Sequence, residues 1–553
     1  MQTIEISLPS GKLLKKPYGF RVTDILEGPE FSAQKDDIIA AYVNNETVSL
    51  SFKIEINADF QPIMLNSPAG ARIYRNTLCF LLNIAFRKEF PDKHLIIGHS
   101  IGSGYYYYIR EEEKIAPEKL KKLEMRMREL VGADLPIVRE SLSYNDALGL
   151  FKEAEFDDTR LLIEFRNTGK IPICACGGFS DLYHHPLALS TGRIRAFAVL
   201  PYEEGFILRY PGPNNFDRLK DFKDNKVLFS VYKEYTVWGK VLNVNSVGKL
   251  NQIIESKKIL DFIRVSEALH DKKIAEIADK INSRLGKVKV VLIAGPSSSG
   301  KTTFTKKLSI QLRVLGFDPL MISLDDYFLP REQTPKDENG NYDFESLRAI
   351  DIDLLNGHLL SLFEGKETPI PIFDFKTGAR KKHSRPLRMT ANNILLMEGI
   401  HGLNPDLTPL VPEDNKFRVY ISALTQLNLD DHNRISTTDN RLIRRIVRDY
   451  QFRGHSAVDS LRMWPSVRKG EDRNIFPYDV NADAAFNSAL DYELAALKSL
   501  AEQLLRSVKP FHDVYAEAVR LRDFLNNFLS VQEKYVPRES ILREFLGDSG
   551  FEY

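Results

Sequence analysis

The segment GPSSSGKT, residues 295–302, constrains the fold of this chain more than any other part of the sequence. It matches the pattern G-x-x-x-x-G-K-[ST] in full. The apolar, β-branched run VVLIA precedes it, as in a strand buried on both faces of a parallel sheet, and the helical run TTFTKKLSIQLRVL follows it. Strand, glycine turn and helix together form a cradle whose backbone N–H groups bind phosphate oxygens. The alternative is a chance Gly/Ser loop, which the flanking strand and helix disfavour.

The cradle residues have distinct expected roles. Lys301 is expected to bridge the β- and γ-phosphates of a nucleoside triphosphate, and the Thr302 hydroxyl to bind Mg²⁺. The residues expected to contact the nucleotide are Gly295, Ser297, Ser298, Ser299, Gly300, Lys301, Thr302 and Thr303. The sequence contains neither the Asn-Lys-x-Asp motif by which GTPases read the base nor a motor or transporter signature. A small-molecule kinase is therefore favoured.

Two later strand-like runs each end in an acid. PLMISL leads into Asp325-Asp326, and NILLMEG places Glu398 at its end. Ligands bind at the carboxyl ends of strands in open α/β sheets, so Asp325 could accept the proton of an attacking hydroxyl and Glu398 could hold Mg²⁺. The alternatives are a helix or turn cap for Asp325 and a solvated strand end for Glu398.

A run of arginines follows in RLIRRIVRD. The arginines stand at i, i+3, i+4 and i+7 of one predicted helix: Arg441, Arg444, Arg445 and Arg448. This spacing places them on one face, where they are expected to bind polyphosphate. The alternative is a solvated basic face paired with Asp439 and Asp449. Arg453-Gly454-His455 adds a hinge and further cations for a lid over the nucleotide.

The hydropathy pattern divides the chain into four parts. Residues 1–65 alternate short β-rich runs with turns, and residues 66–225 read as an α+β module with a helix that starts at Pro117. Residues 226–285 read as a helical connector, in which the apolar spacing over 250–285 indicates a long helical segment packed on one face. Residues 286–553 alternate strand-like and helical runs, which is the βαβ pattern of an α/β domain.

Composition narrows the cellular setting. Lys+Arg 76 against Asp+Glu 75 gives a net charge of +1, so no whole-molecule field attracts nucleic acid or anionic lipid. Three cysteines, Cys79, Cys174 and Cys176, suit a reducing compartment. The chain start has no signal-peptide pattern, and no apolar run reaches the roughly 18–20 residues that span a bilayer. We expect a cytoplasmic protein without a membrane partner, and whether it forms a homo-oligomer is left open.

The cradle, DDYF, EGI and RLIRRIVRDYQFRG, in this order, resemble the uridine kinase and phosphoribulokinase family of P-loop kinases over about residues 286–480. The resemblance implies a P-loop NTPase parallel sheet with flanking helices, ATP as donor and Mg²⁺ as cofactor. It implies Asp325 as general base and Glu398 as the magnesium-associated acid beside Thr302. Lys301 and Arg448 would neutralise the moving phosphoryl group. The remaining implied roles are ribose-hydroxyl binding by Asp343, sugar contact by Arg445 and a lid arginine at Arg453.

The chain departs from the uridine kinases where they read the pyrimidine. Phe373 stands at the position of their Tyr and Gly378 at that of their His, while their Gln falls near Met463. Phe373 is still expected to contact the substrate. The acceptor is therefore left open as a uridine- or cytidine-like nucleoside or a related sugar-bearing metabolite.

The N-terminal half resembles the front end of threonyl-tRNA synthetases. Residues 1–65 resemble a TGS domain, a β-grasp module, and residues 66–225 resemble the second additional domain shared with alanyl-tRNA synthetases. In the editing enzymes that domain uses an H-x-x-x-H pair, a Cys and a His. Here these positions are Asn76, Phe80, Cys176 and Ser180. Editing is not expected, although Cys174-x-Cys176 with His184-His185 leaves a different metal site open.

Two functions follow from these features. The first is an ATP-dependent phosphotransferase with an alcohol acceptor and a regulatory N-terminal half. The alternative is a nucleotide-switched tRNA- or RNA-binding regulator, in which the synthetase-like half binds an RNA end or an amino-acid-like effector. The basic segment 376–388 could contribute an RNA-binding patch, but it lies in the kinase half, and the neutral overall charge counts against RNA binding.

Overall fold

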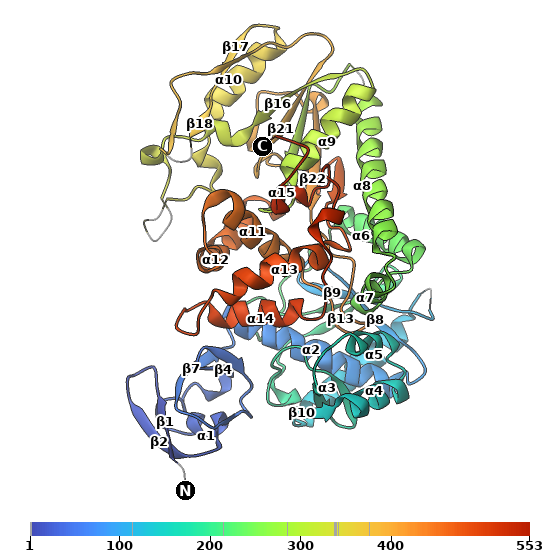
Figure 1. Cartoon of the computed structure of the whole chain (residues 1–553), viewed down its shortest axis with the longest axis vertical. Helices are drawn as coiled ribbons and strands as arrows, with labels where there is room; N and C mark the ends of the chain where they lie inside the picture. Colours follow the sequence, from blue (N-terminus) through green and yellow to red (C-terminus); the bar gives the residue numbers. More distant parts are fainter. Residues whose placement is uncertain are drawn as a thin grey trace.

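The computed structural model describes residues 3–112, 114–213, 215–284, 286–336, 340, 342–374 and 377–552. Its C-terminal half is built on a five-stranded, all-parallel sheet, in the upper part of Figure 1. The strand order is β16 (Asp318–Ser323), β21 (Asn393–Glu398), β15 (Val290–Ala294), β22 (Lys416–Ser422) and β23 (Ala484–Asn487). All five residues of β15 are fully buried, as its apolar sequence predicts for a central strand. The predicted α/β fold is confirmed.

The helices of this half cover both faces of the sheet or pack on the helices that do so (Figure 1). They are α8 (Ile259–Asn282), α9 (Lys301–Val314), α10 (Ile352–Phe363), α11 (Thr437–Arg453), α12 (Ala457–Asn474), α13 (Glu493–Arg506), α14 (Tyr515–Leu525) and the short α15 (Arg543–Leu546). Two short antiparallel ribbons follow α10: β17 (Thr368–Ile370) with β20 (Arg385–Leu387), and β18 (Phe373–Asp374) with β19 (Ala379–Arg380). Alternate residues of β15 enter different cores, Val291 and Ile293 on one face and Val290 and Leu292 on the other.

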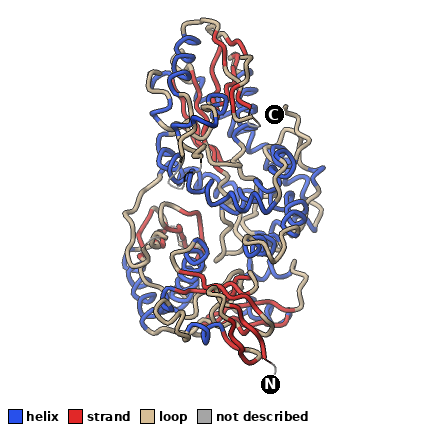
Figure 2. The backbone as a smooth tube through the Cα atoms, turned by 90° about the vertical axis from the view of Figure 1, so that its left-hand side faces the viewer, coloured by secondary structure: helices blue, strands red, loops and turns tan. Residues whose placement is uncertain are grey.

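The N-terminal residues form a mixed five-stranded sheet at the opposite end of the molecule (Figures 1 and 2). Its order is β2 (Leu13–Pro17), β1 (Thr3–Ser7), β7 (Ala58–Met64), β4 (Ile38–Val43) and β5 (Glu46–Val48). Helix α1 (Val22–Leu26) and the small pair β3 (Phe20–Arg21) and β6 (Lys53–Ile54) complete it. This is the β-rich module that the alternating sequence predicts.

Two further sheets and four helices make up the middle region. The helices are α2 (Pro68–Glu89), α3 (Pro117–Gly132), α4 (Tyr144–Glu153) and α5 (Asp157–Glu164). One sheet has the order β13 (Ala198–Tyr202), β14 (Gly205–Arg209), β9 (Gly104–Ile109), β8 (Leu95–Ser100), and the other β10 (Val138–Ser143), β11 (Lys170–Cys176), β12 (Phe179–Leu182). The predicted strand-turn-strand is the antiparallel pair β8 and β9, and α3 starts at Pro117 as predicted.

The segment 226–285 is helical, as the apolar spacing predicts, but its described residues are divided into three helices. The structure has α6 (Lys226–Leu242), α7 (Val247–Glu255) and α8, with a break over residues 256–258. Lys257 has a φ of +60°, a left-handed conformation that ends α7. Periodicity alone did not reveal the break, because the apolar spacing resumes after it. Helix α8 packs on α9, so this segment supports the parallel sheet directly.

One contact between the N-terminal and C-terminal halves is made by residues 423–436, the segment between β22 and α11, here called the interface loop. Ile97 of β8 donates its N–H to the Asp431 carbonyl (2.9 Å), and the Asn428 side chain donates to the Ile97 carbonyl (2.7 Å). His432 lies 2.8 Å from the Asp181 carboxylate, in an ion pair whose side chains are 10% and 5% exposed. The segment that leads into α11 is therefore held by the middle region.

The electrostatics of His432 favour its charged form. Burial alone would lower the pKa of His432, but the carboxylates of Asp181, Asp430 and Asp431 outweigh burial and raise it to about 9.

No helix within the described ranges is long and apolar enough to cross a bilayer.

The ion pair of His432 and Asp181 predicts a loss of stability at alkaline pH. The pKa of His432 is above its ordinary value of 6.5. The contribution of the charged His432 to the free energy of unfolding is therefore complete below pH 6.5 and disappears as pH rises through about 9. We expect the free energy of unfolding to fall by about 1–3 kcal/mol over this window. Chemical denaturation at several pH values measures it. In Asp181→Asn the free energy of unfolding should fall clearly less over the same pH window. An equal fall with pH in the parent and the variant would contradict the assignment to this ion pair.

Candidate active site

The predicted cradle connects β15 to α9. Gly300, the residue before α9, has a φ of +83°, and Ser298 also has a left-handed φ of +59°. A Cβ on Gly295 would lie 2.1 Å from the carbonyl oxygen of Ile421, so only glycine fits there. The hydroxyl oxygens of Ser298 and Ser299 are buried and make no hydrogen bond to described residues. This turn, with its unpaired donors, fits the phosphates expected there.

The two predicted acids lie beside the cradle. In the sheet, Glu398 pairs in register with Ile293 of β15 and with Ser323 of β16, two residues before Asp325. Thr302 Oγ1 is 3.4 Å from Glu398 Oε1. The carboxyl ends of three parallel strands thus bring Thr302, Glu398 and Asp325 to one edge, as expected from the sequence.

Burial dominates the electrostatics of both acids. It raises the pKa of Glu398 to about 7, while the Lys301 ammonium opposes the rise and the Asp325 carboxylate adds to it. Burial also raises the pKa of Asp325, against the lowering effect of Lys301 and Arg453. Desolvated carboxylates beside cations are suited to binding a metal or accepting a proton.

Asp326 and Phe373 form the wall next to Asp325. The Asp326 carboxylate accepts the backbone N–H of Phe373 at 3.2 Å, so this acid positions the β18–β19 ribbon. The Phe373 ring meets Phe328 edge to face, with centroids 5.8 Å apart. The predicted substrate-binding Phe373 therefore lies against the loop that carries Asp325. Residue 376, the first of the basic segment, lies outside the described residues.

A further acid, Glu345, lies near the cradle and was not identified from the sequence. Burial and the Glu471 carboxylate raise its pKa to about 7, while Lys301 and Arg445 lower it. A Cβ on Gly470 would lie 2.7 Å from Glu345 Cγ, so the glycine in α12 makes room for this side chain. For Asp343, two residues earlier, the structure records a backbone N–H bond to the Pro335 carbonyl at 2.8 Å. The contact of Glu345 with Gly470, 125 positions along the chain, is a tertiary one that the local sequence does not reveal.

The four arginines of α11, Arg441, Arg444, Arg445 and Arg448, are called the arginine stripe here. The first two of them connect α11 to the cradle and to buried glutamates. Arg441 donates to the Ser297 carbonyl (2.9 Å) and forms a buried ion pair with Glu471. Arg444 donates to the Ser298 carbonyl (3.3 Å) and to Glu493 (3.1 Å). The prediction that all four arginines face a polyphosphate is wrong for these two. One edge of the stripe faces the protein interior, where buried glutamates neutralise it.

The other arginines gather around Asp449, which is fully buried. Asp449 lies 3.1 Å from Arg445, 2.7 Å from Arg448 and 3.7 Å from Arg453. Arg445 also donates to the Ser297 hydroxyl at 3.0 Å. Three cations share one carboxylate, so the group keeps net positive charge next to the cradle. Gly454, with a φ of +68°, ends α11 where the hinge was predicted.

The alternative prediction, a solvated basic face paired with Asp439 and Asp449, is wrong, although one of the two acids does pair with these arginines. Asp449 does neutralise arginines, but within the protein interior and not on a solvated face. Asp439 pairs with Arg520 of α14 at 2.7 Å.

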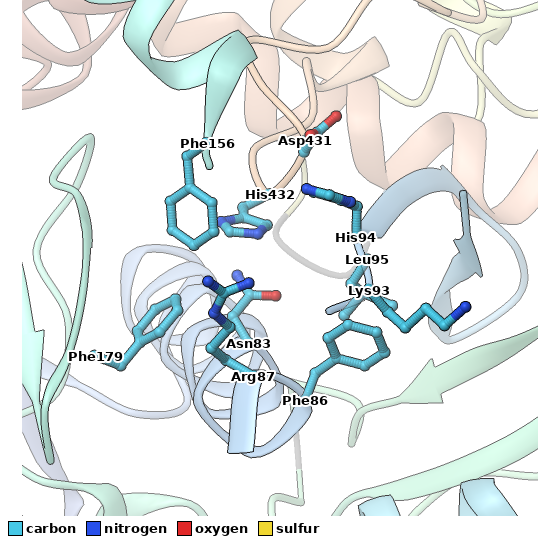
Figure 3. Close-up of a pocket in the computed structure, with 10 residues that line it drawn as sticks. All are labelled: Asn83, Phe86, Arg87, Lys93, His94, Leu95, Phe156, Phe179, Asp431 and His432. Carbon is cyan, nitrogen blue, oxygen red and sulfur yellow. The ribbon is translucent and has the colours of Figure 1, made fainter. Parts of the chain in front are cut away.

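The middle region has a small internal cavity of about 10 Å³ (Figure 3). Phe156, Phe179 and His432 converge on it in the figure, so the interface loop of the C-terminal half contributes part of its wall. The ring of Phe80 packs on Phe179 with centroids 5.6 Å apart. Phe80, which the resemblance to editing enzymes assigns to one of their histidine positions, thus takes part in aromatic packing.

Cys174, Cys176, His184 and His185 are the residues of the alternative metal site left open by the sequence. Cys174 and Cys176 are buried free thiols, and His184 lies 3.6 Å from the Asp430 carboxylate. Within the described ranges, no three His, Cys, Asp or Glu residues are grouped so that they could hold a metal ion.

Comparison with known proteins matches both halves to different families. Residues 290–495 match the Phosphoribulokinase / Uridine kinase family. The C-terminal half therefore contains a region that is similar to this family, and it is called the kinase-like half below. Two solved structures resembling the kinase-like half are a putative fructose transport system kinase from Silicibacter sp. TM1040 (16% identity, TM-score 0.28) and a possible uridine kinase from Bacillus stearothermophilus (19%, 0.27). They cover 38% and 39% of this chain and 98% of their own chains.

The N-terminal part matches threonine–tRNA ligases. The ligase of Syntrophotalea carbinolica is 34% identical over 199 residues, and that of Symbiobacterium thermophilum is 29% identical over 205 residues. Each match covers 36% of this chain but only 31% and 30% of the respective ligase. The chain therefore spans about a third of the length of these relatives.

The buried pair of Arg444 and Glu493 predicts a strong stability effect. Arg444→Ala leaves the Glu493 carboxylate buried without its partner, and we expect a loss of about 3–5 kcal/mol in the free energy of unfolding. Urea denaturation measures it. The matched control is Arg462→Ala, because Arg462 and Asp513 form an exposed pair whose loss should leave the unfolding midpoint close to the parent's. Equal midpoints for the two variants would contradict this.

Proposed function

We propose that this protein is an ATP-dependent kinase that transfers the γ-phosphoryl group to a hydroxyl of a small acceptor, a nucleoside or a related sugar-bearing metabolite. The observation that carries the proposal is the meeting of the cradle, Asp325, Glu398 and the Asp449-centred arginines at one edge of the parallel sheet. The family match of residues 290–495 supports the reaction class.

In the proposed mechanism, the cradle N–H groups and Lys301 bind the phosphates. Mg²⁺, when bound, would be held by Thr302 and Glu398 and would supply positive charge to the β- and γ-phosphates. Arg448 and Arg453 contribute further positive charge from α11. Fixed cations of this kind stabilise charge that develops during transfer, at no cost of reorganisation.

Asp325 is the proposed general base. The acceptor oxygen forms a bond to the γ-phosphorus while the bond from that phosphorus to the β–γ bridging oxygen breaks. ADP leaves, and the acceptor's proton passes to the Asp325 carboxylate. Burial of Asp325 raises its pKa, so the carboxylate is a stronger proton acceptor than an exposed aspartate.

The acceptor is proposed to lie between Asp325 and the wall that contains Phe373. Asp343, Glu345 and Arg445 supply polar groups for its hydroxyls. Phe373 offers an aromatic surface but no hydrogen bond from its side chain, which disfavours the polar edge of a pyrimidine. Uridine and cytidine are therefore weaker candidates than other sugar-bearing alcohols.

Removal of the base tests the mechanism. We expect Asp325→Asn to lower kcat by about 10²–10⁴ and to leave nucleotide affinity nearly unchanged, because the carboxylate acts on the acceptor. Rapid-quench assays with labelled ATP and calorimetric titration measure the two quantities. Asp326→Asn is the neighbouring control, since that carboxylate positions the backbone of Phe373. Near-normal turnover of Asp325→Asn on the true acceptor would exclude Asp325 as the base.

An acceptor screen tests the function itself. Nucleosides and phosphorylated sugars are offered with labelled ATP, and phosphorylated product is scored against ATP hydrolysis alone. We expect one acceptor class to give product in excess of hydrolysis, with uridine and cytidine giving less. Lys301→Met should remove product formation for every acceptor, because the phosphate cradle loses its cation.

The alternative function is an RNA-binding regulator, which the match to threonine–tRNA ligases favours. We place the regulatory role in the regions predicted from the sequence, 1–65 and 66–225, with the segment 226–285 leading to the kinase region 286–553. A tRNA affinity that falls steeply with salt, without phosphorylation of any acceptor, would favour this alternative. The interface loop counts against it, since it covers part of the middle region with the kinase-like half's own residues.

A further inference from the structure

The cradle of this chain is contacted by the C-terminal segment 533–552, here called the strap. Thr303, the third residue of α9, donates its backbone N–H to Glu544 Oε2 at 3.2 Å and its hydroxyl to the same oxygen at 2.8 Å. The N–H groups of the first turn of a helix have no partner within the helix, and in a cradle they are the groups that bind phosphate. A carboxylate of the chain itself therefore binds where a phosphate oxygen is expected.

The strap is anchored on both sides of Glu544. Ile541 packs against the cradle so closely that a Cβ on Gly300 would lie 2.6 Å from its Cγ2. Gln451 of α11 donates to the carbonyls of Phe545 and Leu546 at 3.0 and 2.9 Å. The flanking residues Ile541, Leu542, Phe545 and Leu546 are at most 5% exposed. The strap's backbone is thus part of the core.

Glu544 differs from its neighbours because it is only partly buried. Its side chain can turn towards solvent without unpacking the strap. A phosphate oxygen and a carboxylate oxygen cannot both accept the hydrogen bonds of Thr303. Two negatively charged groups next to each other at this position would also repel. Nucleotide binding must therefore move the Glu544 side chain first, which lowers the observed affinity.

We propose that Glu544 is an internal competitor for the nucleotide's phosphates, which sets the affinity of the cradle. This inference rests on the proposed function, because it requires a triphosphate in the cradle. Glu544 competes only with the phosphate groups, so its effect on affinity does not depend on the base of the nucleotide. Because the strap also contacts α11 through Gln451 and through Phe545, whose ring lies 5.0 Å from the Arg444 guanidinium, it joins the cradle to the arginine helix.

The test compares Glu544→Gln with the full-length parent by calorimetric titration of a non-hydrolysable ATP analogue and of inorganic tripolyphosphate, each with Mg²⁺. Glutamine keeps the shape but loses the charge, which removes a charge-assisted hydrogen bond. We expect both probes to bind Glu544→Gln about five- to tenfold more tightly. Glu539→Gln removes an exposed acid of the same strap and should bind like the parent.

Further variants separate the possible failures. Glu544→Ala should tighten binding in the same direction, and its melting temperature reports whether the strap is still packed. Equal or weaker binding by both Glu544 variants, with parent binding that depends on Lys301, overturns the inference and leaves the proposed function standing. If neither probe binds the parent or the Glu544 variants, the proposed function fails together with it. A gain for the ATP analogue without one for tripolyphosphate also contradicts competition for phosphate.

Discussion

The hydrogen bonds from Arg441 and Arg444 to the carbonyls of Ser297 and Ser298 underlie the rest of the site. A phosphate cradle needs its N–H groups turned inward, so its carbonyls must turn outward and find donors elsewhere. Two buried guanidinium groups supply these donors, and Glu471 and Glu493 neutralise them. Helix α11 is thereby fixed to the cradle, and this fixed position carries Arg445 and Arg448 to its edge. The positive charge of the site thus depends on two arginines that face the protein interior.

The same helix links the site to the N-terminal half. The interface loop enters α11 directly, and its His432, Asp431 and Asn428 are bound by residues of the middle region. Burying a charged pair is unfavourable unless its geometry is good, and such pairs favour one arrangement over others. The kinase-like half and the synthetase-like region are therefore not independent parts of the chain. A change in the middle region has a direct physical route to the arginines through this loop.

Several features of the site could be predicted from the sequence because they depend on neighbours in the chain. The strand VVLIA, the glycine turn and the helix that follows are local, and the acids Asp325 and Glu398 were predicted from their places at strand ends. The roles of individual arginines could not be predicted in this way. A spacing of three and four residues places side chains on one face, but it does not say whether that face meets solvent, a ligand or another helix.

The sequence by itself determined the parallel sheet and the phosphate cradle, because buried β-branched runs and glycines with special backbone geometry have few alternative structures. The tertiary structure decided which charged groups meet there. Glu345, Glu471 and Glu544 approach the cradle from segments 44 to 241 residues away from Lys301 or Thr303, and His432 crosses to Asp181 over 251 positions. Contacts over such separations depend on how whole helices pack, and no local pattern of residues specifies that packing.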